Sequence, residues 1–470
     1  MTLRASILLA LGVSVLTASA QGADLVEVYQ QALQADPQIR EAEATKLANM
    51  EAKPQARAGL LPQLTAAGSI ERSDQDINRT QLSAVTDENG FPTNVVVPVN
   101  LNIKSKPTST QYQVRLTQTL FRWDRWAALR RADRQVAQAE VDYKAAQQDL
   151  LSRVAQRYFD VLAAEDTLKA AQANLEAFAR QLDQANKRFE VGLIAITDVQ
   201  EARAARDQAS ADLIAAKRSL STAQQYLREI TGGSTVDTLA EPKDDMPLQA
   251  PAPADEEQWV SAALDQNLSV LSARLATDIA REDIDAARSG HLPSIDLYAQ
   301  RTGSKDRGDQ VSRRGDTPGS TSPADGDTTI DSVGVQVTFP IYSGGAVSSE
   351  VRQRVYQHRA ARERSERVAR DTERETRDAY LSVISEISRV QALKQALESS
   401  QTALQATEAG FEVGTRTTVD VLDARRRLFE AQTNYYRSRY DYIINVLRLK
   451  LAAGSLSVDD LQEVNGWLAH

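Results

Sequence analysis

Cysteine is absent from the 470 residues of this chain, and histidine occurs only at His291, His358 and His470. Without cysteine no disulfide can hold the fold, so its stability must come from packing or from assembly. Neither a phosphate-binding glycine loop nor a paired metal-ligand motif is present, and the three histidines are far apart. The sequence therefore gives little support to an enzyme, a metal site or a bound cofactor.

Long hydrophobic runs are missing once the first 20 residues are set aside. Residues 1–20 carry Arg4, an apolar run and then small residues, which is the order of a secretory signal. No later stretch approaches the roughly 20 apolar residues that a membrane helix needs. A chain that meets a membrane must therefore do so by another route.

A surplus of one charge sign in any region is missing as well. The formal net charge is -9, but acidic and basic residues are scattered through every segment, which argues against a nucleic-acid partner. The length exceeds the usual size of a single core, so two domains or two repeats are expected.

Helical heptad spacing dominates what is present. Apolar residues recur alternately three and four positions apart from Leu168 to Phe189, which is the seam of a coiled coil. No proline or glycine interrupts residues 126–189. At about 1.5 Å per residue, that segment would form a rod on the order of 95 Å long. The pattern predicts long helical hairpins at 126–231 and 346–453, although an ordinary long bundle would give the same spacing.

Four short segments break the helical pattern. Two of them, GLLPQLTAAGSIERS and GHLPSIDLYAQ, pass a glycine and then Pro62 or Pro293, which together stop a helix before a strand-like alternation. The other two, TQYQVRLTQTLF and DSVGVQVTFPIY, alternate apolar and polar residues. Strand pairs are therefore predicted at about 60–121 and 291–342.

Polar loops rich in Asp, Gly, Ser, Thr and Pro are predicted inside these pairs, at 78–107 and 305–329. Alternating strands of about ten residues with long loops on one side are typical of outer-membrane barrels. Phe121, Trp123 and Trp126 fall where strand gives way to helix, as an interfacial aromatic belt would. A small soluble sheet that caps a helical bundle is the alternative.

A membrane sheet of this size requires assembly. Four strands cannot enclose a lumen, and each unpaired backbone group at an open edge in lipid costs several kcal/mol. Two copies would supply about eight strands, which side chains would fill, whereas three would supply about twelve and leave a lumen. The geometry favours three copies only weakly.

One phrase occurs in both halves of the chain. RFEVGLIAITDVQEAR in the first half returns as GFEVGTRTTVDVLDAR in the second. Gly192 and Gly414 each follow a heptad run and predict a helix end. Thr197 with Gln200 resembles a capping box that opens the next helix. These phrases therefore predict helical hairpin turns, at the end of the rods away from the strands.

Together with the GLLP and GHLP transitions and the phrase VYQQALQADPQIREA, these turns resemble the TolC family, the outer-membrane factors of tripartite export systems. The resemblance covers nearly the whole chain after the signal. It implies a fold that is mainly α with a membrane β-barrel, in which a homotrimer forms a barrel of about twelve strands in the outer membrane. A long α-helical coiled-coil barrel would continue it through the periplasm.

The resemblance also implies a domain organisation. Two structural repeats would occupy residues 21–231 and 258–454, separated by an equatorial linker at 232–257 that is rich in proline. Residues 455–470 would form a C-terminal equatorial segment.

The implied function is the exit duct of tripartite efflux, including multidrug export, or of type I secretion. The implied partners are outer-membrane lipid, a periplasmic adaptor (membrane fusion) protein, and an inner-membrane pump or ABC transporter. Small molecules or proteins would be the exported cargo, and no cofactor is implied. A periplasmic coiled-coil adaptor or scaffold without a pore is the competing hypothesis, but it would not need strands that are apolar on one face.

Acidic residues just past the second turn are the first candidate site. Asp420 and Asp423 lie three apart on one helical face, and in the family this pair faces the tunnel axis, where it forms the periplasmic constriction. Crowded carboxylates would have raised pKa values and attract cations. Asp198 and Glu201 hold the same places in the first repeat, and acidic residues in a first helical turn also simply favour the helix dipole.

The resemblance carries over further residues that hold the entrance closed. Arg416 matches an arginine that bridges to the neighbouring hairpin at the positions of Thr197 and Asp198. Glu408 and Gln181 match a second linking pair.

One position departs from the family pattern. Phe411 stands in the hairpin where the family's best-known pattern has a tyrosine, so a hydroxyl-mediated link to Asp198 is missing. We therefore expect closure to depend more on Arg416.

Overall fold

The computed structural model describes residues 23–233, 238–243 and 246–469. The predicted signal at 1–20 lies outside the described residues, as does part of the predicted linker. The chain divides into two compact units. One comprises residues up to 49, 137–276 and 361 onward, and the other comprises 50–136 and 277–360.

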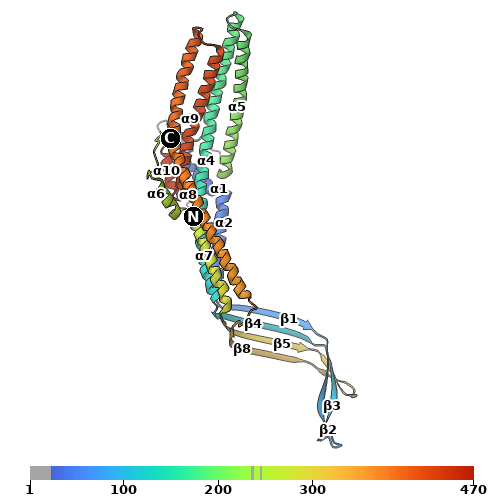
Figure 1. The fold of residues 1–470 in the computed structure, drawn as a ribbon. Helices are drawn as coiled ribbons and strands as arrows, with labels where there is room; N and C mark the ends of the chain where they lie inside the picture. Colours follow the sequence, from blue (N-terminus) through green and yellow to red (C-terminus); the bar gives the residue numbers. More distant parts are fainter. Residues whose placement is uncertain (1–22, 234–237, 244–245, 470) are drawn as a thin grey trace, which may run out of the picture. The chain divides into compact units, whose positions relative to one another are not determined.

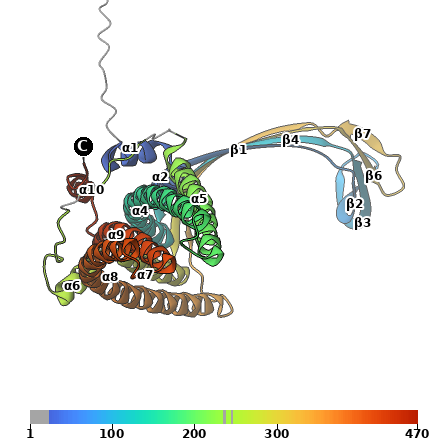
Figure 2. The ribbon, with the colours of Figure 1, turned by 90° about the horizontal axis from the view of Figure 1, so that it is seen from above.

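Four long helices form two hairpins. α4 (Trp123–Glu190) is followed by α5 (Ile196–Thr231), and α8 (Ala346–Glu412) by α9 (Thr418–Ala452). Figures 1 and 2 both show the two helices of each hairpin side by side. Among the described residues, no helix combines the length and apolar composition that crossing a bilayer requires. The shorter helices are α1 (Leu25–Ala35), α2 (Pro37–Met50), α3 (Ala52–Ala58), α6 (Glu256–Gln266), α7 (Leu268–Arg288), the 3₁₀ turn η1 (Ser289–His291) and α10 (Val458–Asn465).

The heptad seam is buried where the spacing predicts it. On α5 the seam residues Val199, Ala202, Ala209 and Ala216 are buried. Near the first turn, Ala185 of α4 packs with Val199 and Ala202 in one small cluster. Small side chains at these places let the two helix backbones approach closely, so the hairpin packs through alanine rather than through large residues.

The main core joins segments that are far apart in the sequence. α1, α4, α9 and α10 pack around Tyr158, whose hydroxyl lies 2.9 Å from the carbonyl oxygen of Ala240. The backbone N–H of Lys243 donates to the carbonyl of Trp467 at 2.9 Å, and that of Ala469 donates to Glu241 at 2.8 Å. The described parts of the linker and of the C-terminal segment therefore lie against the same core.

The first sheet has the strand order β1-β4-β5-β8, all antiparallel. Its strands are β1 (Gln63–Arg72), β4 (Thr108–Phe121), β5 (Ser294–Arg307) and β8 (Gly326–Thr338). Pro62 and Pro293 stand directly before β1 and β5.

The two faces of the first sheet differ as the alternation predicts. The pairing puts Leu116 opposite Leu64 and Ala299, and Ala299 opposite Val333, so these residues share one face. The opposite face is polar, and there the amide of Gln113 donates to that of Gln300 at 3.2 Å. β8 ends at Thr338, earlier than the predicted 342.

The predicted polar loops are wrong, because both segments contain strands. β2 (Gln75–Thr86), β3 (Pro92–Ser105), β6 (Asp309–Arg314) and β7 (Ser320–Pro323) form a second sheet with the order β2-β3-β6-β7. In the phrase NVVVPVNLNIK of β3, β-branched and aliphatic residues recur at every second position. Two prolines and several asparagines obscure that alternation, and pairing with β2 and β6 decides the conformation.

Candidate functional site: the two helical hairpin turns

The first turn closes through the backbone. After α4, Gly192 adopts a φ of 73°, and the N–H of Leu193 donates to the carbonyl of Arg188 at 2.8 Å. α5 begins at Ile196, and its N-cap is Ala195, whose methyl side chain cannot accept a hydrogen bond from the helix. The predicted capping box at Thr197 and Gln200 is therefore wrong, because Thr197 already lies inside the first helical turn.

The second turn has the capping box that the first lacks. Gly414 adopts a φ of 80°, and Thr417 is the N-cap of α9. The N–H of Asp420 donates to the Thr417 hydroxyl at 3.3 Å, and the N–H of Thr417 donates to the Asp420 carboxylate at 2.8 Å. The spacing of Thr417 and Asp420 is visible in the sequence and could have identified this box.

The capping box sets the electrostatics of Asp420. Hydrogen bonds from the backbone N–H of Thr417 and then from its hydroxyl lower the pKa of the Asp420 carboxyl, because they stabilise its charged form. This is opposite in sign to the rise predicted from crowding of like charges. That rise depends on other copies of the chain, whereas the hydrogen bonds form within one.

Asp423 has its own partners. Its carboxylate pairs with Arg426, one helical turn away, and lies 4.0 Å from Arg427. The two predicted constriction residues therefore differ in their surroundings: Asp420 belongs to the turn, and Asp423 to a cluster of charges on α9.

Glu408 forms an ion pair across the second hairpin. Its carboxylate accepts from the guanidinium of Arg425, which lies on the opposite helix of the same hairpin. The two side chains are only 36% and 23% exposed. Sequence reasoning missed Arg425 because the contact depends on how α8 and α9 align.

Gln181 lies on α4 and is 6% exposed. Its side-chain nitrogen has no hydrogen-bond partner within the described chain. The predicted pairing of Gln181 with Glu408 stays a prediction, since Glu408 contacts Arg425 here.

Phe411 connects the two hairpins. The guanidinium of Arg188, at the end of α4, lies 4.4 Å from the centre of the Phe411 ring on α8, a cation–π contact. Phe411 lacks the hydroxyl of the tyrosine in the family pattern, but its ring forms this contact with Arg188 instead. No pattern within either hairpin alone pointed to Arg188.

Arg416 lies on the exposed second turn, with its aliphatic stem against Gly410. Within the described chain it forms no hydrogen bond or ion pair with Thr197 or Asp198. The predicted bridge between these residues would join neighbouring hairpins and stays a prediction.

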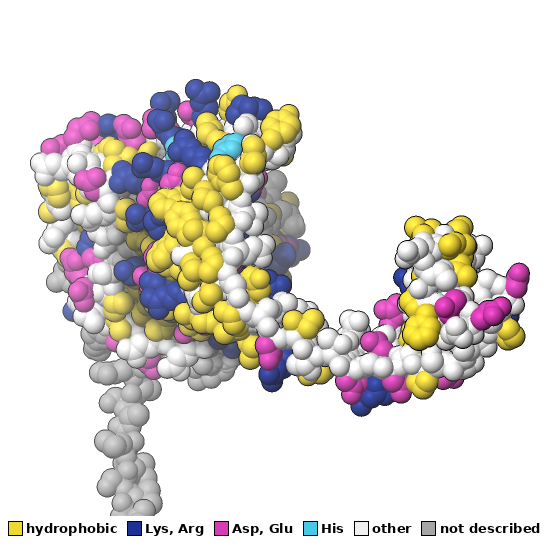
Figure 3. Space-filling view, turned by 90° about the horizontal axis from the view of Figure 1, so that it is seen from below, with side chains coloured by type: hydrophobic (Ala, Val, Ile, Leu, Met, Phe, Trp, Pro, Cys, Tyr) yellow, Lys and Arg dark blue, Asp and Glu magenta, His cyan; other side chains and the backbone are white. Residues whose placement is uncertain are grey.

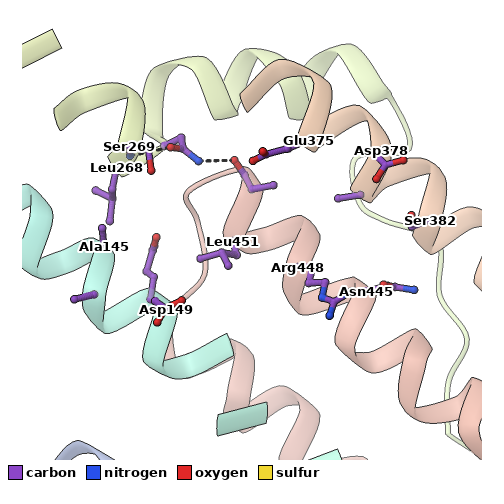
Figure 4. A pocket seen from close by; sticks show the side chains of 15 residues that line it. Ala145, Asp149, Leu268, Ser269, Glu375, Asp378, Ser382, Asn445, Arg448 and Leu451 are labelled. Carbon is purple, nitrogen blue, oxygen red and sulfur yellow. Dashed lines mark hydrogen bonds between the residues drawn. The ribbon is translucent and has the colours of Figure 1, made fainter. Parts of the chain in front are cut away.

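A separate cavity of about 650 Å³ lies between α4, α7, α8 and α9. Figure 4 shows Asp149, Glu375, Asp378 and Arg448 around it, and Asn267 donates to the carbonyl of Ala452 at 2.9 Å. In the described part of the chain, no three His, Cys, Asp or Glu side chains come together as a metal site would require. The lining mixes these charged side chains with apolar ones such as Leu268 and Leu451, and its geometry points to no reaction.

Comparison with known proteins bears on this arrangement of paired hairpins and a two-faced sheet. A family model described as "Outer membrane efflux protein" matches residues 28–233 and 259–455, one match in each half of the chain. The chain belongs to the outer membrane efflux protein family. The two matched ranges each contain one strand pair of the first sheet and one helical hairpin.

Relatives within this family are similar over most of their length. The chain is 37% identical to "Outer membrane protein TolC" of Escherichia coli (strain K12), over 98% of this chain and 88% of that protein. It is 26% identical to "Alkaline protease secretion protein AprF" of Pseudomonas aeruginosa, over 94% of this chain and 86% of that protein. The crystal structure of the Campylobacter jejuni CmeC outer membrane channel has the same fold, with a TM-score of 0.71 and 16% identity, and the match covers 96% of this chain and 91% of that one.

Membership of this family confirms the predicted resemblance to TolC, the fold class and the location in the outer membrane. It also decides between the competing hypotheses, because the family consists of channel-type outer membrane proteins and not of periplasmic scaffolds. The chain is therefore an efflux-type exit channel.

Proposed function

We propose that three copies of this chain assemble into the outer-membrane exit duct of a tripartite efflux or type I secretion system. The observation that carries this proposal is the first sheet, whose edge strands β1 and β8 lack a second partner in the described chain. One of its faces is apolar and exposed, including Leu64, Leu116 and Val333. In lipid these edges require strands from further copies.

The proposed duct performs no chemistry and uses no energy source of its own. Its water-filled lumen is lined by the polar face of the sheet and by polar positions of the helices. A periplasmic adaptor and an inner-membrane pump or ABC transporter supply the energy, and small molecules or proteins are the cargo. The secretion function named for AprF and the 37% identity to TolC support this assignment.

The proposed domain organisation follows the two repeats. Residues 21–231 and 258–454 each contribute a strand pair and a hairpin, while 232–257 and 455–470 form an equatorial region around the tunnel. The bonds between Lys243 and Trp467 and between Glu241 and Ala469 support this placement.

The proposed gate is at the hairpin turns. Asp420 and Asp423 of three copies would form the constriction, and Arg416 would bind Thr197 and Asp198 of a neighbouring hairpin to hold it closed. Gln181 and Glu408 would form a further link once Glu408 exchanges its partner Arg425. Docking of the adaptor would open the entrance by relaxing the hairpins.

Single-channel conductance in planar bilayers tests the gate. Arg416→Ala should raise the conductance of the closed state several-fold, because the link between hairpins is lost. Lys187→Ala removes a charge beside the first turn, where the described chain pairs Lys187 with Asp183 on its own helix, and should leave conductance unchanged. If Arg416→Ala has no effect while Phe411→Tyr alters the closed state, the assignment to Arg416 is wrong.

Assembly is tested separately by fractionation and mass measurement of the purified protein. We expect the protein in the outer membrane fraction, as an oligomer of three chains in detergent. A monomer that is stable without detergent would contradict the proposed duct.

A further inference from the structure

The outer part of the β2–β3 hairpin is apolar on both faces. The register puts Leu82 opposite Pro98 and Ala84 opposite Val96 on one face, while Val97 lies opposite Ser83 on the other. Leu82 is 68% exposed and Val96 59% exposed, and on the other face Val95 is 59% exposed. Figure 3 shows hydrophobic side chains gathered at this end of the sheet region. We call residues 80–99 the outer ribbon.

The inner part of the same hairpin has only one apolar face. There Asp76, Asn78 and Asn102 share a face and are joined by hydrogen bonds, with Lys104 3.3 Å from the Asp76 carboxylate. Ile77 and Ile103 are paired on the opposite face. The change from one apolar face to two therefore occurs within a single hairpin.

The outer ribbon is a formed structure with a defined turn. At its end the carboxylate of Asp87 accepts from the backbone N–H groups of Asn89, at 3.0 Å, and Phe91, at 2.8 Å. The hydroxyl of Thr93 donates to the carbonyl of Val85 at 2.6 Å. Its apolar side chains are therefore held outward and exposed in a single chain.

Hydrocarbon is a poor environment for this ribbon. Among the residues that the structure describes, β6 pairs with β3 only from Leu101 to Ser105, and β2 pairs only with β3. Within this part of the chain, both edges of the outer ribbon therefore carry unpaired backbone groups. Each such group would cost several kcal/mol in lipid. The first sheet already has strands of 10 to 14 residues, enough to cross a bilayer. Its outer end carries the ion pair of Arg307 and Asp327, so the second sheet begins beyond a charged boundary.

Other copies of the chain fit both faces. In a threefold ring each contact joins one face of a subunit to a different face of the next, so an element near the axis needs two complementary faces. We propose that the outer ribbons of three copies pack face to face and close the external mouth of the channel. This inference rests on the proposed trimeric duct. The contact between outer ribbons would extend the interface between copies that the open edges of the first sheet require.

Disulfide formation tests the cap, because the natural chain has no cysteine. Leu82→Cys and Val97→Cys lie on opposite faces of the outer ribbon, so they cannot join within one chain. Under mild oxidation of the membrane-reconstituted full chain, the double variant should convert most subunits to covalent trimers, and neither single variant should form them. A control pair on exposed β7, Ser320→Cys with Thr321→Cys, should stay monomeric on the same gel.

Two outcomes would overturn the cap. One is a sample that is trimeric by mass measurement but forms no covalent trimers in the double variant. The other is a Val96→Cys variant whose attached fluorophore is quenched by brominated lipid, which would place the ribbon in the bilayer. A sample that is not trimeric by mass contradicts the proposed duct itself, so the two failures are distinguishable.

Discussion

The two hairpin turns have nearly the same sequence and are stabilised in different ways. The phrase that starts at residue 188 returns at 410, so residues 222 positions apart correspond (410 − 188). Thr417, the N-cap of α9, corresponds to Ala195, the N-cap of α5, and only Thr417 forms a capping box. Arg425 pairs with Glu408 across the second hairpin, whereas the first turn relies on backbone bonds and on packing around Ala185 and Val199.

This difference suggests a division of roles between the turns. The second turn is held by hydrogen bonds and an ion pair, whose side chains can form the same contacts with other partners. The first turn is held by buried apolar packing, which cannot be exchanged in this way. If the second turn is the part that moves in gating, its contacts can be removed one at a time and each loss measured.

The ion pair in the second hairpin should give the largest effect. We expect Arg425→Ala to weaken the closure of this hairpin by about 1.5 kcal/mol, because a half-buried carboxylate loses a charged donor. Amide hydrogen exchange near the turn should then be faster by about tenfold. Arg203→Ala, at the corresponding exposed position of the first hairpin, is the control and should change exchange little. If Arg425→Ala and Arg203→Ala speed amide exchange equally, the ion pair is not what distinguishes the second turn from the first.

Exchanging the N-cap residues should alter both turns in opposite directions. Thr417→Ala removes the side-chain cap and should destabilise the start of α9 by about 1 kcal/mol, while Ala195→Thr should stabilise the start of α5 by a similar amount. Hydrogen exchange of the first-turn amides should be about fivefold faster in the first variant and slower in the second. A Thr417→Ser variant keeps a hydroxyl and should stay close to the wild type; if it behaves like alanine, the cap is not the cause.

The contribution of the Asp420 carboxylate should depend on pH. Because its folded-state pKa is lowered, the stabilisation is present above the usual Asp value of about 3.9 and is lost as the pH falls through the lowered pKa. Asp420→Asn should therefore speed exchange at neutral pH, and the difference from wild type should shrink in acid, after correction for the intrinsic rate. Asp198→Asn is the matched control. If crowding between copies dominates instead, Asp420→Asn should slow exchange at neutral pH, because it removes a repelling charge, and this opposite difference should also shrink in acid.

The contact between hairpins should give the smallest effect. Phe411→Leu removes the aromatic ring that faces Arg188 and should cost about 0.5 kcal/mol. We expect exchange near both turns to be about twofold faster, because each hairpin contributes one partner. Phe411→Tyr keeps the ring and should not produce this change; a change confined to one hairpin would show that Arg188 and Phe411 do not couple them.

Helices and glycine turns were predictable because their signals are local. Residues 126–189 were expected to be helical, and α4 extends from Trp123 to Glu190. Gly192 and Gly414 mark both turns, since a positive φ is easiest for glycine. The start of α5 was less predictable: Thr197 with Gln200 matches the usual capping-box pattern, but the helix begins two residues earlier, with Ala195 as its N-cap. The box forms instead at Thr417 and Asp420 in the second turn.

The second sheet was missed for a different reason. Asparagine and proline in 78–107 are typical of loops. The alternating apolar residues of β3 stabilise a strand only when β2 and β6 pair with it. The contacts of Arg425 with Glu408 and of Arg188 with Phe411 are similar cases. Each joins residues on different helices, so neither heptad pattern nor family resemblance pointed to them.

The sequence by itself determined the lengths of the long helices, the buried alanine seam and the two faces of the first sheet, because each depends on a period that the chain repeats along its own axis. Only the tertiary structure decided which charges pair at the second turn, which ring Arg188 contacts and that the outer ribbon exposes two apolar faces. These features depend on the relative register of separate helices and strands, and that register is set by packing between segments distant in the chain.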